Sequence, residues 1–325
     1  MDSFNKNSNF SKIRTHAFLF AIISSILLSI LKLITGFMTN SLSIIAMGID
    51  SFLDVIFTNF NFFAVRLSEK PADKNHPLGH GKFEDISTLL QSIVIILVGV
   101  YIFIMALKGL FFDSDYSETK VIFDTGFLAI IVMSISTIGS VLISIVLRVA
   151  GKKTDSSAMI ADSLHYTTDI ISNGSILVGV IIAKYFHILW MDDFLSLIFS
   201  LFIIYSAGKL FIDAIKILTD SNIPKELEDK INTILEKNKG ILLNHHNFFA
   251  VKSGSFYMIS FHIETCRFMS LELAHDGVDK IEKQIESEIP NSIVTIHIDP
   301  CDHKNEGNED CVRVNKIIEQ YKRKD

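Results

Sequence analysis

Long runs of apolar residues alternate with short polar segments over the first two thirds of the chain. A helix that crosses a bilayer needs about 20 mostly apolar residues. Stretches of that length occur at residues 17–37, 41–65, 86–110, 121–147, 157–185 and 194–217. The pattern therefore predicts an α-helical membrane protein with six transmembrane helices.

The pattern changes after residue 223, where shorter periodic segments replace the long runs. Residues 226–237 carry apolar side chains at helical spacing. Residues 247–252 and 256–264 read as the two strands of a hairpin, because Ser253 and Gly254 separate them. A helix over 270–288 and a last strand in SIVTIHIDP complete an α-β-β-α-β order. This order predicts a small soluble α+β domain.

Composition agrees with this division. The 325 residues are 49% hydrophobic and 20% charged, and the mean hydropathy of +0.39 is too high for an ordinary soluble domain of this length. Charged residues are sparse up to about residue 218 and dense from residue 220. We expect a cytosolic tail over 1–13, a transmembrane transport domain over 14–219, a cytosolic domain over 220–300 and a polar, disordered tail over 301–325.

Net charge and cysteine usage limit the class of partner and the redox compartment that fit this chain. A net charge of −6 without a basic stripe argues against nucleic acid as the main partner. Cys266, Cys301 and Cys311 are too few, and odd in number, for a disulfide framework, which fits a reducing compartment. Cys301, Cys311 and His303 could chelate a metal ion, but a polar tail without metal is the favoured interpretation.

The lysines and arginines predict the orientation. Cytoplasmic loops carry an excess of these residues, so we expect both termini in the cytosol and the protein in the cell inner membrane. Lys32 lies within the first apolar run, and we expect it to extend to the outer interface rather than to act in transport. The residues assigned to the cytosolic side are Lys6, Lys12, Arg14, Arg66, Lys70, Lys74, Lys82, Arg148, Lys152 and Lys153, against Lys108, Lys120 and Lys184 outside.

Acidic residues interrupt two of the apolar runs. The stretch IDSFLD puts Asp50 and Asp54 four residues apart, so both share one helix face. In the stretch ADSLHYTTD, His165 and Asp169 are likewise four residues apart and share one helix face. Both pairs fall near the same depth in the predicted topology. A carboxylate in the membrane is costly and usually marks an ion path. We expect the two pairs to meet, whereas Asp162 could either attract cations in a vestibule or serve in capping or packing.

The chemistry of Asp50, Asp54, His165 and Asp169 suits tetrahedral zinc, because it combines three carboxylates with one imidazole. Metal ligands must be deprotonated, so protons compete with metal for such a site. A site that faces the two sides of the membrane in turn would exchange metal for protons. The structural alternative is that the four side chains only form hydrogen bonds between helices.

The loop after the second run, EKPADKNHPLGHGKFED, contains Asp73, His76 and His80 within eight positions. Its proline and glycine content is typical of turns. A metal site and a polar loop with incidental histidines are equally compatible with the residues alone.

The combined motifs resemble the cation diffusion facilitator family of divalent metal/proton antiporters, and its bacterial iron and zinc efflux members in particular. The resemblance rests on DSFLD, PADKNHPLGHGKFE, ADSLHYTTD and HIDP. It implies that the four intramembrane residues form the transport site, that Asp73, His76 and His80 form a second metal site, and that the protein is a homodimer in the lipid bilayer. A histidine in the quartet typically accompanies zinc, with cadmium, iron or cobalt tolerated.

The resemblance also implies a ferredoxin-like cytosolic domain with its own metal cluster. His297 and Asp299 share a strand face by alternation. Without the family, scattered surface histidines would be the favoured interpretation; with it, metal binding that regulates transport is favoured. Lys82 and Asp220 are further expected to pair between subunits. The residues implied for the cluster are His246, His262, His275, His297 and Asp299.

Two other function classes are compatible with buried metal ligands. An intramembrane metalloenzyme is disfavoured, because the chain has no H-E-x-x-H motif and no nucleophile elbow. A passive metal channel is disfavoured because conduction needs a site weak enough to release its ion quickly. The sequence therefore favours a secondary active transporter over an enzyme.

Overall fold

The computed structural model describes residues 2–38, 42–111, 126–186, 191–221, 223–238, 242–289 and 291–302, with single positions at 309, 312 and 316. These residues divide into two compact units, Phe10–Leu218 and Thr219–Asp325 together with Met1–Asn9. The first contains α1 (Asp2–Met38) from Phe10 onward and the long helices α2 (Leu42–Ser68), α3 (Lys82–Phe111), α5 (Gly126–Thr154), α6 (Ser157–Phe186) and α7 (Met191–Leu218).

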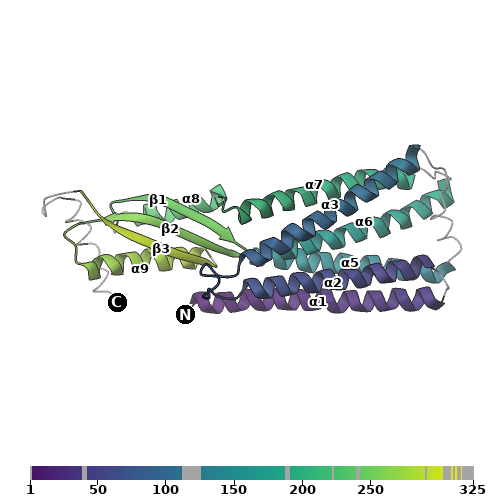
Figure 1. Cartoon of the computed structure of the whole chain (residues 1–325), viewed down its shortest axis with the longest axis horizontal. Helices are drawn as coiled ribbons and strands as arrows, with labels where there is room; N and C mark the ends of the chain where they lie inside the picture. Colours follow the sequence, from purple (N-terminus) through teal and green to yellow (C-terminus); the bar gives the residue numbers. More distant parts are fainter. Residues whose placement is uncertain are drawn as a thin grey trace. The chain divides into compact units, whose positions relative to one another are not determined.

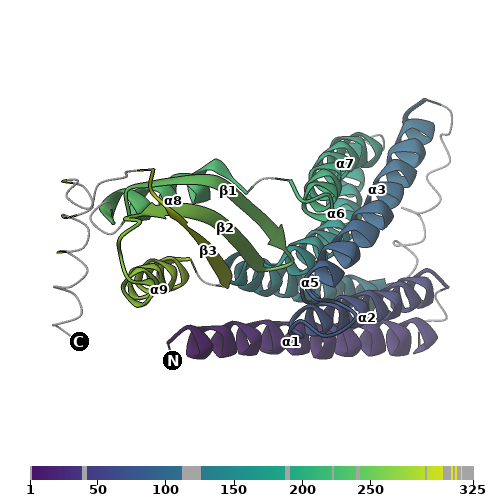
Figure 2. The same cartoon turned by 60° about the vertical axis from the view of Figure 1, so that its left-hand side comes forward.

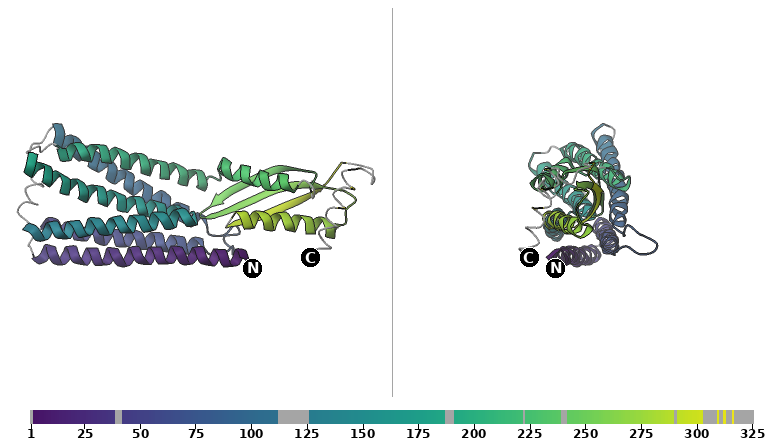
Figure 3. Two further views of the ribbon diagram at one scale, coloured as in Figure 1. Left: turned by 180° about the vertical axis from the view of Figure 1, so that it is seen from behind. Right: turned by 90° about the vertical axis from the view of Figure 1, so that its left-hand side faces the viewer.

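The long helices lie side by side in a bundle, in which α3 packs along α7 and α5 packs along α6 (Figure 1; Figure 3, left). A helix occurs at each of the six predicted positions. Within the described residues, four helices are long and apolar enough to cross a membrane, namely Asn9–Met38, Lys82–Phe111, Ile131–Thr154 and Ser196–Leu218. The described parts of α2 and α6 are outside this set, and both carry acidic side chains near their middle. The bundle is therefore a membrane domain with four clear spans.

The bundle is apolar outside and polar inside. Leu27, Phe63 and Leu97 are more than 60% exposed, whereas Asn61 and Gln91 are buried. A soluble protein would reverse this arrangement. In a bilayer it exposes apolar side chains to lipid and lets polar groups bond to one another between helices.

Two glycines let α1 and α2 approach closely. A Cβ on Gly48 would lie 2.8 Å from Cδ2 of Leu33, and a Cβ on Gly36 would lie 2.7 Å from Cγ1 of Ile45. The hydroxyl of Ser29 donates a hydrogen bond of 2.9 Å to the carbonyl of Gly48. The two helices are therefore held at short range along the half of α2 that carries Asp50.

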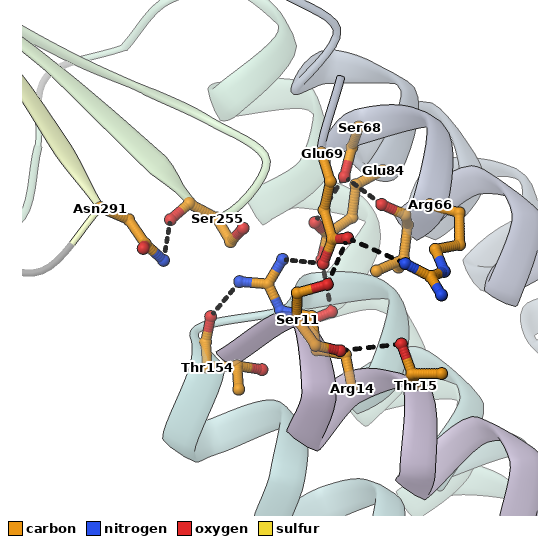
Figure 4. A network of polar contacts seen from close by, with 12 residues as sticks. Ser11, Arg14, Thr15, Arg66, Ser68, Glu69, Glu84, Thr154, Ser255 and Asn291 are labelled. Carbon is orange, nitrogen blue, oxygen red and sulfur yellow. Dashed lines mark hydrogen bonds and ion pairs between the residues drawn. The ribbon is translucent and has the colours of Figure 1, made fainter. Parts of the chain in front are cut away.

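A polar network joins the ends of α1, α2 and α5 (Figure 4). Arg14 is buried; one guanidinium nitrogen donates to Oε1 of Glu69 at 3.3 Å and another to the carbonyl of Thr154 at 3.1 Å. Ser11 donates to Oε2 of the same glutamate at 2.8 Å. Arg66 approaches that oxygen at 3.8 Å from an exposed position. Glu69 is therefore the shared acceptor that balances the buried charge of Arg14.

Replacing Glu69 by glutamine destabilises the helical unit by about 3 kcal/mol, because it leaves a buried guanidinium without its counter-charge. Denaturation of the purified protein in mixed micelles measures this change. Arg66→Gln is the matched control and costs less than about 1 kcal/mol, since that side chain is 49% exposed. Equal effects of the two substitutions would contradict the assignment.

The second unit is an α-β-β-α-β domain, as predicted, built from α8 (Lys225–Lys237), β1 (Asn244–Ser253), β2 (Phe256–Thr265), α9 (Leu271–Glu288) and β3 (Ser292–Pro300) (Figure 2). The sheet order is β1-β2-β3, with β1 and β2 antiparallel and β2 and β3 parallel. Gly254 takes a φ of +59° in the hairpin turn, and Ser270 caps α9 by accepting a hydrogen bond from the backbone N–H of Leu273.

One face of this sheet forms the core of the domain. Phe261 and Ile263 of β2 are fully buried against Ile231 of α8 and Ile281 of α9. Strand side chains alternate between faces. His262 therefore points to the face that the two helices leave uncovered.

Candidate metal centres

The first cluster of metal-ligating side chains lies between α2 and α6. Nε2 of His165 and Oδ1 of Asp54 are 2.8 Å apart. Asp169 joins them, because each of the three residues offers a ligand atom within 4.8 Å of the others. Asp54 is buried, and His165 and Asp169 are half-buried. The spacing of four residues on α6 puts His165 and Asp169 on one face, and that face meets Asp54 of α2.

Asp50, the fourth residue of the predicted quartet, lies outside this 4.8 Å group. It stands one helical turn before Asp54 and is exposed in the single chain. Its carboxylate interacts electrostatically with both Asp54 and His165. The structure thus brings three of the four residues together and puts the fourth beside them.

Asp162 of α6 is fully buried and accepts hydrogen bonds from α2 and α3, which favours the packing role over the vestibule role left open for it. Its Oδ1 accepts hydrogen bonds from the amide groups of Asn61 and Gln91, both at 3.0 Å. Thr58 donates to the same oxygen at 3.4 Å. Sequence reasoning missed Asn61 and Gln91, although Asn61 follows Asp54 by seven residues and therefore lies on the same face of α2.

Lys32 does not extend to the outer interface, and that expectation is wrong. The side chain is 8% exposed, and its Nζ donates a hydrogen bond of 2.7 Å to the hydroxyl of Ser51. Close packing of α1 on α2 explains the difference, because Ser51 follows Gly48 by one helical turn and faces α1. The lysine is held inside the bundle.

The second cluster lies in the loop between α2 and α3. Asp73, His76 and His80 offer ligand atoms within 4.8 Å of one another. Oδ1 of Asp73 accepts the backbone N–H groups of Asn75 at 2.8 Å and His76 at 2.7 Å, which folds the loop into a tight turn. Gly79 takes a φ of +83°, which returns the chain so that Nε2 of His80 lies 3.5 Å from Oδ2 of Asp73.

The backbone also sets the charge of this loop cluster. The N–H of His76 holds the pKa of the Asp73 carboxyl below its ordinary value, and the N–H of Asn75 and the two imidazoles act in the same direction. Asp73 is therefore a carboxylate over the whole physiological pH range. Its Oδ1 lies 3.6 Å from Nδ1 of His76 and its Oδ2 lies 3.5 Å from Nε2 of His80, so the three side chains are close enough to share a metal ion.

The third cluster lies on the uncovered face of the sheet in the second unit. His246 of β1 is the register partner of His262 on β2, and His262 is in turn the partner of His297 on β3. Three imidazoles therefore form one row across the sheet. Asp299 joins them: its carboxylate lies 3.2 Å from Nε2 of His246, 2.9 Å from Nδ1 of His262 and 3.3 Å from Nε2 of His297.

Asp299 is the shared acceptor of this row. The hydrogen bond from His262 holds the pKa of the Asp299 carboxyl below its ordinary value, and the charges of the neighbouring imidazoles add to the effect. His246, His262 and Asp299 offer ligand atoms within 4.8 Å of one another. One nitrogen from each imidazole and one carboxylate oxygen are a donor set that fits zinc.

His275 does not join this row within one chain. It lies on α9, is mostly exposed, and has Asp279 of the same helix 3.7 Å from its Nδ1. Because α9 packs on the opposite face of the sheet, a ligand role for His275 needs a second subunit.

Two further predicted groups remain, namely the pair of Lys82 with Asp220 and the tail site of Cys301, His303 and Cys311. Nζ of Lys82 donates to the carbonyl of Leu218 at 3.4 Å, and its pairing with Asp220 of another subunit stays a prediction. Cys301 is buried together with Cys266. His303 and Cys311, the other members of the predicted tail site, lie outside the described residues.

Comparison with known proteins adds two kinds of match. The cation efflux transmembrane domain family matches residues 18–219, and the cation efflux protein cytoplasmic domain family matches residues 223–301. The chain is 30% identical to the cation-efflux pump FieF of Citrobacter koseri and of Escherichia fergusonii, and 31% identical to that of Escherichia coli K12. Each alignment spans 296 residues, which is 91% of this chain and 95% of the relative.

Proposed function

The chain belongs to the cation diffusion facilitator family, and from that premise we propose that it exports zinc from the cytoplasm in exchange for protons. The observation that carries the proposal is the meeting of Asp54, His165 and Asp169 from two helices within the apolar unit. Hydrogen bonding alone does not need two acids and an imidazole converging on one point. Asp50, one turn away, supplies the fourth ligand.

The donor set favours zinc. Zinc accepts imidazole nitrogen and carboxylate oxygen in tetrahedral sites, whereas magnesium and calcium take more oxygen ligands. Cadmium, ferrous iron and cobalt accept similar ligands and are the secondary substrates. An ion in this site is cargo, so it enters and leaves during each cycle.

Proton exchange follows from the same ligands. The carboxylates and the imidazole bind zinc only when they are deprotonated, and the charge of histidine changes near neutral pH. A site open to the cytosol takes up zinc and releases protons. A site open to the outside takes up protons and releases zinc.

The proposed setting is the inner membrane of the cell. All six long helices cross the bilayer, with Asp54 of α2 and Asp169 of α6 turned toward each other, and both termini are cytosolic according to the distribution of lysine and arginine. The protein acts as a homodimer through its cytosolic domain, and Lys82 and Asp220 pair between subunits at the membrane surface.

Flux measurements in liposomes test this function. The purified protein is reconstituted, a pH gradient is imposed, and zinc and proton movements are followed together. We expect saturable zinc transport that is driven by the gradient and accompanied by proton movement in the opposite direction. Zinc flux that rises linearly with the zinc concentration and does not depend on the pH gradient would support a passive channel instead.

The cytosolic cluster is proposed to sense zinc. His246, His262, His297 and Asp299 bind the ion on one subunit, and His275 contributes from the second subunit. Zinc that binds one arrangement of the dimer favours that arrangement. Rising cytosolic zinc therefore activates transport.

The loop cluster is proposed to be a second zinc site, and its zinc affinity falls as the pH is lowered from 7 to 5. Histidine side chains take up protons in this range. Asp73 does not, because its pKa lies below its ordinary value of 3.8 and it remains charged throughout. Zinc titration of full-length protein carrying Asp54→Ala and Asp299→Ala measures the loop site alone.

Asp73→Asn in the same background is the control, and it weakens zinc binding at every pH between 5 and 7. Binding that is independent of pH over this interval would contradict the participation of His76 and His80.

A further inference from the structure

Lys32 places a positive charge beside the transport site. Among the lysines and arginines whose burial the structure describes, only Arg14 and Lys32 are buried. Arg14 has Glu69 as its counter-charge. The hydrogen-bond partner of Lys32 is the neutral hydroxyl of Ser51, which follows Asp50 by one residue and precedes Asp54 by three.

The charge of Lys32 is balanced by the site. Its ammonium group is held at Ser51, between Asp50 and Asp54 in the sequence of α2, and it interacts electrostatically with Asp50 and with Asp169 of α6. An isolated charge in a bundle interior is costly, and such charges pair with groups of opposite sign. The carboxylates of the transport site are the groups that serve this purpose.

The position of the ammonium group is fixed by packing. Ser29 of α1 bonds to the carbonyl of Gly48, and Leu33 of α1 lies against Gly48 with no room for a Cβ. Lys32 lies between these two contacts in sequence and is held at the same helix interface. Its charge therefore stays beside the site throughout the time that α1 and α2 remain packed.

We propose that Lys32 is a built-in counter-cation that sets how tightly the transport site holds a divalent ion. A lysine ammonium has no lone pair to offer a metal ion. Its charge stabilises the metal-free carboxylates and repels the incoming ion, and both effects weaken ion binding. A transporter needs this balance, because an ion held too tightly is not released. The inference deepens the proposed function and rests on it.

The test compares zinc binding and transport in full-length variants that also carry Asp73→Ala and Asp299→Ala. In this background the measured zinc binding is that of the transport site. Lys32→Met keeps the length of the side chain and removes the charge, and it lowers the zinc dissociation constant about tenfold or more. In liposomes it lowers both KM and kcat, since binding tightens and release slows. Lys32→Arg retains the charge and stays within about threefold of the parent in both measurements.

Ser51→Ala is the matched control for a purely structural role, because it removes the hydrogen bond and leaves the charge. It changes the zinc dissociation constant less than about twofold. If Ser51→Ala and Lys32→Met act alike, or if Lys32→Met leaves binding unchanged or weakens it, the inference is overturned. If Lys32→Met does not fold, the zinc dissociation constant is measured with Lys32→Gln, whose side chain is also neutral.

Failure of the proposed function gives a different result from failure of the role of Lys32. If the parent protein shows no zinc binding that depends on Asp54, the transport site itself is wrong. If the parent binds zinc through Asp54 but the neutral variants match it, only the role of Lys32 is wrong.

Discussion

Replacing Asp54 by asparagine lowers zinc transport about a hundredfold or more. Asp54 is the most buried of the three clustered ligands, and its Oδ1 lies 2.8 Å from His165. The substitution removes a charged ligand and also the partner that orients the imidazole. Loss of an outer partner of a metal ligand alone weakens binding about 10- to 100-fold, so loss of a ligand that is also such a partner has the larger effect.

Zinc uptake into liposomes at saturating zinc measures this change, and Asp213→Asn is the matched control. Asp213 is an acid of α7 that is about half exposed and lies 3.6 Å from Lys216. The same chemical change there leaves transport within about twofold of the parent, because an exposed ion pair contributes little. Transport by Asp54→Asn at the rate of the control would remove Asp54 from the ion path.

Replacing Asp299 by alanine removes activation by cytosolic zinc while transport at saturating zinc persists. Asp299 lies within 3.3 Å of His246, His262 and His297, so its loss takes away the carboxylate and the group that aligns the three imidazoles. We expect the zinc affinity of the cytosolic domain to fall about a hundredfold. Transport then begins only at higher zinc concentrations, without the steep rise of the parent.

Paired histidine variants separate metal binding from general damage to the strand. His246→Ala weakens zinc binding by the cytosolic domain, whereas His245→Ala does not, because adjacent strand residues face opposite sides of the sheet. Calorimetric zinc titration of full-length protein carrying Asp54→Ala and Asp73→Ala measures both. Equal losses in the two variants would contradict a site on the uncovered face.

The spacing of the acidic and histidine side chains on each helix made the cluster between α2 and α6 predictable. Asp50 and Asp54, and likewise His165 and Asp169, are four residues apart, and an α-helix turns such pairs to one face. The facing of the two helices follows from the cost of exposing these groups to lipid. Spacing does not fix side-chain rotation, which is why Asp50 lies beside the cluster rather than in it.

The surroundings of the site were not predictable in the same way. Asn61 and Gln91 bond to Asp162 because of how α2 and α3 are rotated about their axes, which is decided by packing across the whole bundle. Lys32 carried the strongest signal, a cation in an apolar run, but sequence alone does not distinguish a lysine that reaches the interface from one held by a close helix contact.

The row of histidines on the sheet was also predictable only in part. Alternation predicted that His297 and Asp299 share a face. It did not predict that His246 lies opposite His262, because a break in register between His246 and Phe249 shifts the pairing, and Asn247 takes a φ of +50° there. A bulge of this kind depends on the partner strand and has no clear sequence signature.

The most direct test of the central claim is a measurement of protons released when zinc binds to the transport site. Full-length protein carrying Asp73→Ala and Asp299→Ala is titrated with zinc in a weakly buffered solution at pH 7, with and without Asp54→Ala. The account predicts net proton release that accompanies zinc binding and disappears with Asp54→Ala. Zinc binding without proton release, or release that is unchanged by Asp54→Ala, would contradict competition between zinc and protons for Asp54, His165 and Asp169.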